Sequence, residues 1–314
     1  MWDLRAGTAS DRPLYGWSQF FGSRQNPSAI GTAYGLRLAM ALDVQDSRLE
    51  LPRIVSSLLS SERPGGGWSA RSQRGESGHP EVTAWVLPPL IRVGLDAEQR
   101  SRLITRFEYM LEPDADVGLQ STVVLSSCLS ALADIAPTSS RAVQLADALL
   151  DGARIAAGGS VDQVAWSSSL SKKGGDPSVP HTARAVVALH KFAAAAMPGK
   201  GSGYVESSLA GAAWLRNNAD FDLFDEPIRR DMVGDKTDEV VVGHFTPAWL
   251  ARALMITGDL GDLELLRKAV RLTLAHQVNG VWRVRRTSQE PIWMTYQGTA
   301  AIREYTLRNL PWPP

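Results

Sequence analysis

A theme that recurs six times along the chain constrains its fold more than any other feature of the sequence. Each copy is a loop rich in Gly, Pro or Ser, followed by a Thr that opens a segment rich in Ala, Leu and Val. Because each interval has room for two helices and their loops, the repeat predicts a series of helix pairs. The threonines are Thr32, Thr83, Thr122, Thr182, Thr246 and Thr299.

The segments between these threonines have a different pattern from the Thr-led segments. Leu51, Ile54, Val55, Leu58 and Leu59 fall at i, i+3, i+4, i+7 and i+8, which is one apolar stripe on a helix with a polar opposite face. Similar stripes run through 97–111, 141–155, 206–217 and 262–276. The Thr-led segments are apolar on most sides, which is typical of helices buried all round.

Two alternating kinds of helix predict an all-α fold, an (α/α)6 toroid. Six parallel inner helices line a central funnel, and an outer ring of helices shields them. We expect one domain over 1–314, with its core at about 30–305. Pro88-Pro89 falls inside the second Thr-led segment, where it is expected to kink or end the helix. Strand-like alternation is limited to short runs such as Val240-Val241-Val242.

The composition favours some partners and excludes others. Lys+Arg and Asp+Glu both number 33, so the chain is formally neutral and no nucleic-acid partner is expected. The sequence contains no run of eighteen apolar residues and its start does not resemble a signal peptide, which predicts a cytoplasmic protein without a transmembrane segment. No cofactor motif is visible. The many Arg and Ala residues are typical of bacterial proteins.

Two loops carry a family resemblance. The segment from Glu62 to Gly65-Gly66-Gly67-Trp68 and the segment from Gln277 to Gly280-Val281-Trp282 resemble the Q-x3-G-x-W repeat of squalene–hopene and oxidosqualene cyclases. In those enzymes the repeat ties an outer helix to the next inner helix by stacking Gln on Trp. The resemblance implies the α/α toroid of terpenoid cyclases and protein prenyltransferases, with an isoprenoid or other hydrophobic ligand in the funnel.

The catalytic motifs of that superfamily are incomplete. The cyclase DxDD motif is absent, and Asp114-Ala115-Asp116 offers only its D-x-D half. His181-Thr182 resembles the His-Thr of prenyltransferase β subunits, and Gly243-His244 resembles their Gly-Cys with His in place of a zinc-binding Cys. These two elements occur in reversed order and without the Asp-x-Cys spacing, so we predict no metal site.

Parallel inner helices gather their leading loops at one rim, which defines the candidate site. Asp116, His181 and His244 are the candidate catalytic residues, and Asp116 would serve as an acid if burial raised its pKa. The alternative is that these residues cap helix ends. Five aromatic residues are candidate ligand-binding side chains through their ring faces, with core packing as the alternative: Tyr34, Trp85, Trp249, Trp293 and Tyr296.

Three functions are compatible with these patterns, and the sequence does not decide whether the chain is an enzyme. The first is binding or transformation of an isoprenoid or other hydrophobic small molecule in the funnel. The second is a toroid without catalysis that acts as a protein-interaction module in a bacterial complex. The third is a carbohydrate-active (α/α)6 enzyme with two carboxylates at the rim.

Overall fold

The computed structural model describes residues 5–9, 12–70, 78–112, 121–155, 163–171, 175–196, 202–232, 236–258, 263–284 and 289–312. The chain divides into two compact units. The first unit is Met1–Val117 with His276–Ala300, and the second unit is Gly118–Ala275 with Ala301–Pro314. Within the described ranges the structure is mostly helical, and no helix there is long and apolar enough to cross a membrane.

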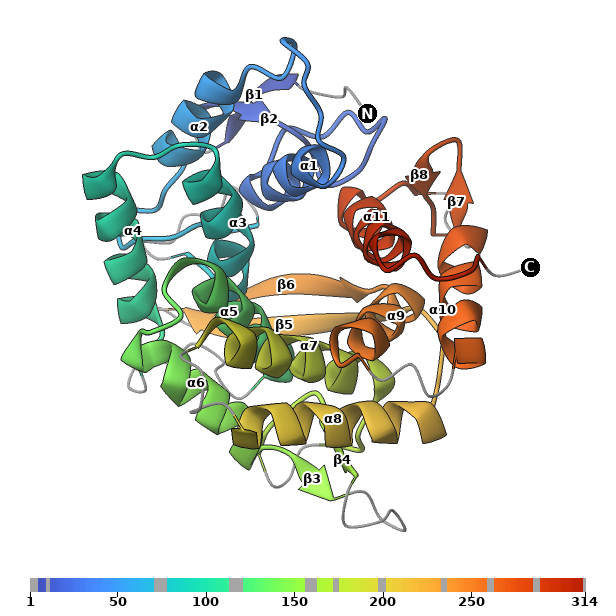
Figure 1. The fold of residues 1–314 in the computed structure, drawn as a ribbon. Helices are drawn as coiled ribbons and strands as arrows, with labels where there is room; N and C mark the ends of the chain where they lie inside the picture. Colours follow the sequence, from blue (N-terminus) through green and yellow to red (C-terminus); the bar gives the residue numbers. More distant parts are fainter. Residues whose placement is uncertain are drawn as a thin grey trace. The chain divides into compact units, whose positions relative to one another are not determined.

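The two kinds of predicted helix are confirmed (Figure 1). The Thr-led helices are buried on most sides, so that α5 buries serines as well as apolar residues. The striped helices bury one face only. The Thr-led helices are α1 (Ala29–Ala41), α3 (Pro80–Arg92), α5 (Thr122–Ile135), α7 (Val179–Ala195), α9 (Thr246–Ile256) and α11 (Ile292–Leu307). The striped helices are α2 (Leu51–Ser60), α4 (Ala97–Met110), α6 (Ser140–Asp151), α8 (Ser202–Asn217) and α10 (Leu263–Ala275).

One local arrangement that joins a loop to a Thr-led helix occurs three times in the first unit and once in the second, within the described residues. The backbone N–H of a tryptophan donates to the Oγ1 of a threonine that is the fourth residue of the helix. The four pairs are Trp17–Thr32, Trp68–Thr83, Trp166–Thr182 and Trp282–Thr295, at 3.0 to 3.2 Å. Trp68 and Trp282 are 1% and 6% exposed, which confirms that both are buried at turns between helices.

Two of these tryptophans, Trp68 and Trp166, also form a hydrogen bond to the preceding striped helix. The indole N–H of Trp68 donates to the carbonyl of Leu58 in α2, and that of Trp166 donates to the carbonyl of Leu149 in α6, both at 2.8 Å. One side chain therefore satisfies a C-terminal carbonyl of one helix while its backbone is fixed to the start of the next. Glu62, at the position of the Gln of the cyclase repeat, forms ion pairs with α4 instead.

The start of α11 differs from the prediction. The helix begins at Ile292, and the threonine that accepts from Trp282 is Thr295, whereas Thr299 lies further inside the helix. Gly298 explains the misleading Gly-Thr pair, because a Cβ there would lie 2.4 Å from the ring of Trp282. The glycine makes room for the tryptophan and does not mark the helix start.

The Pro88-Pro89 pair does not end α3, which continues to Arg92. The two prolines lack the N–H groups that would bond to the carbonyls of Ala84 and Trp85, four residues earlier. Arg37 of α1 supplies the missing donors: its Nε lies 3.1 Å from the Trp85 oxygen and its Nη2 lies 3.4 Å from the Ala84 oxygen. A side chain from the neighbouring helix thus replaces two backbone hydrogen bonds.

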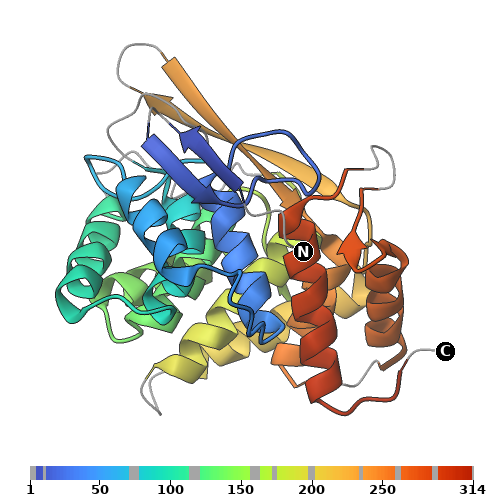
Figure 2. The same cartoon turned by 90° about the horizontal axis from the view of Figure 1, so that it is seen from above.

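The described part of the chain also contains four antiparallel two-stranded hairpins. They are β1 (Arg5–Ala9) with β2 (Arg12–Gly16), β3 (Arg154–Ile155) with β4 (Val164–Ala165), β5 (Phe224–Met232) with β6 (Lys236–His244), and β7 (Gln277–Val278) with β8 (Val281–Trp282). Figure 2 shows β5 and β6 as a long hairpin that leads into α9. This hairpin is a correction to the expectation of short strand-like runs, and it carries part of the candidate site.

Candidate functional site

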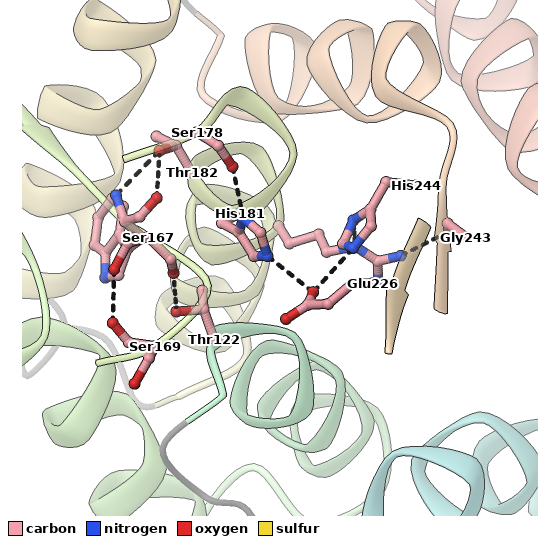
Figure 3. A network of polar contacts seen from close by, with 11 residues as sticks. Thr122, Ser167, Ser169, Ser178, His181, Thr182, Glu226, Gly243 and His244 are labelled. Carbon is pink, nitrogen blue, oxygen red and sulfur yellow. Dashed lines mark hydrogen bonds and ion pairs between the residues drawn. The ribbon is translucent and has the colours of Figure 1, made fainter. Parts of the chain in front are cut away.

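Three buried polar side chains meet in the second unit. His181 comes from the first turn of α7, Glu226 from β5, and His244 from the last residue of β6. Oε2 of Glu226 lies 2.9 Å from Nε2 of His181 and 3.1 Å from Nε2 of His244. Figure 3 shows both imidazole rings directed at this one oxygen. Two of the predicted catalytic residues are thus brought together by a glutamate that the sequence analysis did not single out.

The register of the hairpin places Glu226 and His244 on one face. Phe224 lies opposite His244, and Glu226 lies opposite Val242. Directly opposed residues share a face of a sheet, as do residues two apart on one strand. Glu226 and His244 are therefore diagonal neighbours. The first turn of α7 brings His181 to the same carboxylate.

Glu226 is ionised although it is buried. Burial by itself raises its pKa, but the N–H groups of His181 and His244 stabilise the carboxylate and lower the pKa to about 2. An ionised carboxylate only accepts hydrogen bonds, so each Nε2 that faces it carries a proton. The Oε1 oxygen of Glu226 accepts no hydrogen bond from the described residues.

Arg184 fixes the tautomer of His244 from the opposite side of the ring. Its Nε lies 3.2 Å from Nδ1 of His244, and its Nη2 lies 3.5 Å from the carbonyl oxygen of Gly243. A guanidinium has donors only, so Nδ1 accepts and the ring proton is on Nε2. Burial lowers the pKa of His244 to about 3; the charge of Arg184 adds to this effect and the hydrogen bond to Glu226 opposes it. His244 is therefore neutral at pH 7.

Ser178 holds His181 from the other side of its ring. The hydroxyl oxygen of Ser178 lies 2.5 Å from Nδ1 of His181. With a proton on Nε2 that faces Glu226, the ring can accept the hydroxyl proton of Ser178 at Nδ1. One hydrogen-bonded chain therefore runs from Ser178 through His181 to the carboxylate, and a second reaches it from Arg184 through His244.

The His181–Glu226–His244 cluster satisfies the distance requirement of a metal site but not its chemistry. The candidate ligand atoms lie within 4.8 Å of one another, and imidazole and carboxylate are zinc ligands. A histidine that binds zinc through Nε2 donates from Nδ1 to an acceptor. Nδ1 of His244 instead faces the donor Arg184, whose charge also opposes a second cation. The absence of a metal stays a prediction: we expect elemental analysis to find far less than one zinc per chain.

Aromatic rings border the cluster. Phe224 is 45% exposed, and its ring centroid lies 5.3 Å from that of His244 and 6.0 Å from that of His181. Trp249 of α9 is buried beneath Arg184, with 4.4 Å between the guanidinium carbon and the ring centroid. The indole N–H of Trp249 finds no hydrogen-bond acceptor in the described part of the chain. The polar cluster therefore has a partly exposed aromatic ring at its border, and Arg184 contacts both His244 and the buried Trp249.

Three other predicted ligand-binding aromatics lie together in the first unit. The ring centroids of Tyr34, Trp85 and Tyr296 are 4.9 to 6.1 Å apart. The guanidinium of Arg37 lies 4.9 Å from the Trp85 centroid and 6.0 Å from that of Tyr296. Tyr34 is buried, whereas Trp85 and Tyr296 are half-buried. These contacts are compatible with core packing, the alternative considered for these residues, and a ligand-binding role for them stays a prediction.

The two remaining predicted residues take no part in either cluster. Trp293 lies in the first turn of α11, half-buried, with no ring contact to the described residues. Asp116 lies outside the described residues. Its predicted role as an acid stays a prediction.

Sequence reasoning missed Ser178, Arg184 and Glu226. Ser178, His181 and Arg184 are spaced three residues apart, which places them on one side of the start of a helix, so this signal was available. Glu226 gave no comparable signal, because it lies in a segment without helical periodicity and is paired with His181 only through the fold.

Comparisons with known proteins identify the fold class. Neither a protein-family model nor a curated protein matches the chain. A family 76 glycoside hydrolase from a bovine Bacteroides thetaiotaomicron strain is similar over 95% of this chain and 74% of that chain, with a TM-score of 0.59 and 9% identity. A sugar epimerase from a ruminal bacterium is similar over 95% and 92%, with a TM-score of 0.60 and 12% identity. At this identity the likeness shows the fold alone, which is all-α and of the (α/α)6 toroid class.

Proposed function

We propose that this chain is a carbohydrate-active enzyme in which His181 exchanges protons with a hydroxylated substrate. The observation that carries the proposal is the ionised Glu226, which accepts hydrogen bonds from both imidazoles in a buried cluster. Imidazole is the side chain best suited to proton transfer near neutral pH. A fixed carboxylate sets which ring nitrogen holds the proton and stabilises the imidazolium that forms.

Proton transfer suits the cluster better than glycoside hydrolysis. Hydrolysis generally needs two carboxyl groups that flank the bond to be broken. Glu226 is the one carboxylate in hydrogen-bond contact with the two described imidazoles, and the other polar partners are Ser178 and Arg184. We therefore favour removal and return of a proton at a carbon next to a carbonyl, which is the chemistry of sugar isomerisation and epimerisation. The similarity in fold to a sugar epimerase is compatible with this proposal.

The aromatic border supports a sugar as the substrate. A sugar ring offers hydroxyl groups at its edge and apolar C–H groups on its face. The exposed ring of Phe224 would contact the face, while Oε1 of Glu226 would accept from a hydroxyl group. This combination of one stacking ring and a few polar atoms is typical of small-molecule sites.

The isoprenoid hypothesis has less support. It depends on a funnel formed by Thr-led helices of both units, and the funnel stays a prediction. The aromatic faces of Tyr34, Trp85 and Tyr296 contact one another and Arg37, which supports a structural role for them. A cavity of about 490 Å³ lies on the striped helix α4, lined by polar as well as apolar residues: Leu95, Ala97, Arg100, Ser101, Ile104 and Thr105. The terpenoid-cyclase resemblance, the interaction-module alternative and the cytoplasmic location likewise stay predictions.

Exchange with solvent deuterium tests the proposal without knowledge of the product. The purified protein is incubated in D₂O with aldohexoses, N-acetylhexosamines and disaccharides, and the C2 proton is followed by ¹H NMR. We expect loss of that signal with at least one sugar, slowed at least ~100-fold in His181→Asn and Glu226→Gln, within the range for removal of a general base. His190→Asn, on the same helix but bonded to Ser208, is the matched control and should exchange normally.

Absence of exchange with every sugar, from protein that retains its cooperative thermal unfolding, would contradict the proposal. Retained exchange in both His181→Asn and Glu226→Gln would place the reaction elsewhere in the chain. The interaction-module hypothesis would gain support from the first of these results.

A further inference from the structure

Ser178 is the residue at the N-cap of α7, and its hydroxyl group does not cap the helix. We propose that Ser178 is a covalent nucleophile for carboxylic esters, with His181 as its base and Glu226 as the group that orients the base. This inference uses the base of the proposed function but depends on neither its sugar substrate nor its proton exchange at carbon.

A second serine in the chain shows the usual role of a serine at a helix N-cap. Ser28 is the N-cap of α1, with φ −132° and ψ 155°, and Ser178 has φ −135° and ψ 156°. The N–H of each donates at 3.0 Å to the carbonyl of a tryptophan, Trp17 or Trp166. The hydroxyl of Ser28 accepts from the N–H of Gly31 at 3.1 Å, as expected of an N-cap. With the same backbone and the same residue type, only Ser178 turns its hydroxyl away from the helix.

The difference follows from the residue three positions later. Gly31 offers only a backbone N–H, whereas His181 also offers an imidazole nitrogen. The hydroxyl of Ser178 lies 2.5 Å from Nδ1 of His181, and Nε2 of the same ring lies 2.9 Å from Glu226. A nucleophile in contact with a base that is itself oriented by a third group is the arrangement that activates serine. Here Nδ1 serves as the base nitrogen and Nε2 as the oriented one.

The remaining parts of the site suit this reaction. Ser178 is half-buried, whereas His181 and Glu226 are buried. His244 donates to the same carboxylate and holds it in place. The hydroxyl of Ser178 leaves the N–H of His181 unused at the start of a 17-residue helix, and such N–H groups stabilise a developing oxyanion.

The reaction is balanced with water as the one co-reactant. Nδ1 of His181 takes the proton of Ser178 as Oγ bonds to the ester carbonyl carbon. The tetrahedral intermediate collapses, the bond from carbon to the alcohol oxygen breaks, and the imidazolium returns the proton to the alcohol. Water then attacks the acyl-serine through the same base, which releases the acid and restores the hydroxyl group.

A fluorophosphonate probe tests the nucleophile directly. The purified chain is treated with the probe, and intact mass and peptide mapping follow the adduct. We expect one adduct per chain on Ser178, none at that residue in Ser178→Ala, and labelling at least ~100-fold slower in His181→Asn and Glu226→Gln. Ser28→Ala is the matched control, since it changes the equivalent N-cap, and it should label at the wild-type rate.

Two results would overturn the inference. The first is no adduct on folded wild-type protein under conditions that label a serine hydrolase standard. The second is an adduct that persists at the same rate in Ser178→Ala. Labelling requires no sugar, so a positive result here with no deuterium exchange would reject the proposed function alone, and the reverse pair of results would reject this inference alone.

Discussion

An arginine lies over a tryptophan in each unit, and the two pairs are put to different uses. In the first unit Arg37 reaches from α1 to Trp85 of α3, and in the second unit Arg184 reaches from α7 to Trp249 of α9. Arg37 donates to two backbone carbonyls, whereas Arg184 donates to the imidazole of His244. The same pair of side chains therefore supports a helix in one unit and sets a protonation state in the other.

The two arginines differ in the groups that accept their hydrogen bonds. Pro88 and Pro89 leave carbonyl groups that cannot change their protonation, so Arg37 contributes to stability alone. His244 can exist in three protonation states, so a donor at Nδ1 selects one of them. A contact between Arg and Trp is thus a poor guide to function unless the group that accepts the guanidinium hydrogen bonds is also known.

Loss of a tryptophan that joins the helices should have the largest effect on stability, and it should be equal in the two units. Trp68→Ala and Trp166→Ala each remove a buried ring and an indole hydrogen bond. We expect each to lower the free energy of unfolding by about 3–5 kcal/mol, the usual range for large aromatic residues in a core. Chemical denaturation measures both. A neutral result for either would show that the shared arrangement does not support its unit.

Arg37→Ala should cost about 2–4 kcal/mol, because it leaves two carbonyl groups without donors and removes the contact with Trp85. The control is the same substitution in a Pro88→Ala, Pro89→Ala background. There the restored N–H groups bond to the carbonyls of Ala84 and Trp85, so the cost should fall by at least half. An equal cost in both backgrounds would mean that Arg37 does not replace the missing donors.

The His181–Glu226–His244 cluster of the second unit should make the chain sensitive to acid, whereas the aromatic rings around Arg37 in the first unit should not. The pKa of His244 is about 3 in the folded chain against 6.5 for the free side chain. Between these pH values His244 binds a proton in the unfolded chain but not in the folded chain, so the free energy of unfolding falls as the pH falls. From pH 7 to pH 5 the loss is about 2 kcal/mol. Glu226, with a pKa of about 2 against 4.5, adds a further loss below pH 4.5.

Denaturation of His244→Asn at the same two pH values isolates this contribution, since the variant lacks the titrating ring. Its stability should change by about 2 kcal/mol less than that of the wild type between pH 7 and pH 5. Parallel pH dependence of the two proteins would show that His244 does not titrate as described.

The smallest expected difference concerns the two N-cap serines. Ser28→Ala removes a hydrogen bond to the helix and should cost about 1 kcal/mol. Ser178→Ala removes no cap and should cost less, as measured by thermal unfolding of the two variants side by side. A larger loss for Ser178→Ala would indicate that the bond to His181 serves mainly to hold α7.

Much of the fold could be predicted because its signals are local. The threonines mark the starts of Thr-led helices, and the stripe from Leu51 to Leu59 defines α2. Thr299 was misleading because Gly298 makes room for the ring of Trp282, which lies outside the helix, and does not mark a helix start. The hairpin of β5 and β6 was missed because its strands are rich in charged residues and contain Pro227, which an unpaired edge tolerates.

The candidate site was predicted only in part, for a related reason. His181 and His244 were recognised because both precede or open Thr-led helices. Their common partner Glu226 lies 45 residues after His181 and 18 before His244, and no local pattern links the three. Ser178 pairs with His181 within the start of one helix, but the proton position of His244 depends on Arg184, 60 residues earlier in the sequence, and that pairing arises only once the hairpin packs on α7.

The protonation of His244 tests the central claim most directly. Long-range ¹H–¹⁵N correlation spectra of the ¹⁵N-labelled chain distinguish the tautomers of each histidine, and His244→Asn assigns the signal. We expect His244 to be neutral with its proton on Nε2, unchanged between pH 5 and pH 8, as Arg184 and Glu226 require. A proton on Nδ1, or a doubly protonated ring at pH 7, would contradict the account.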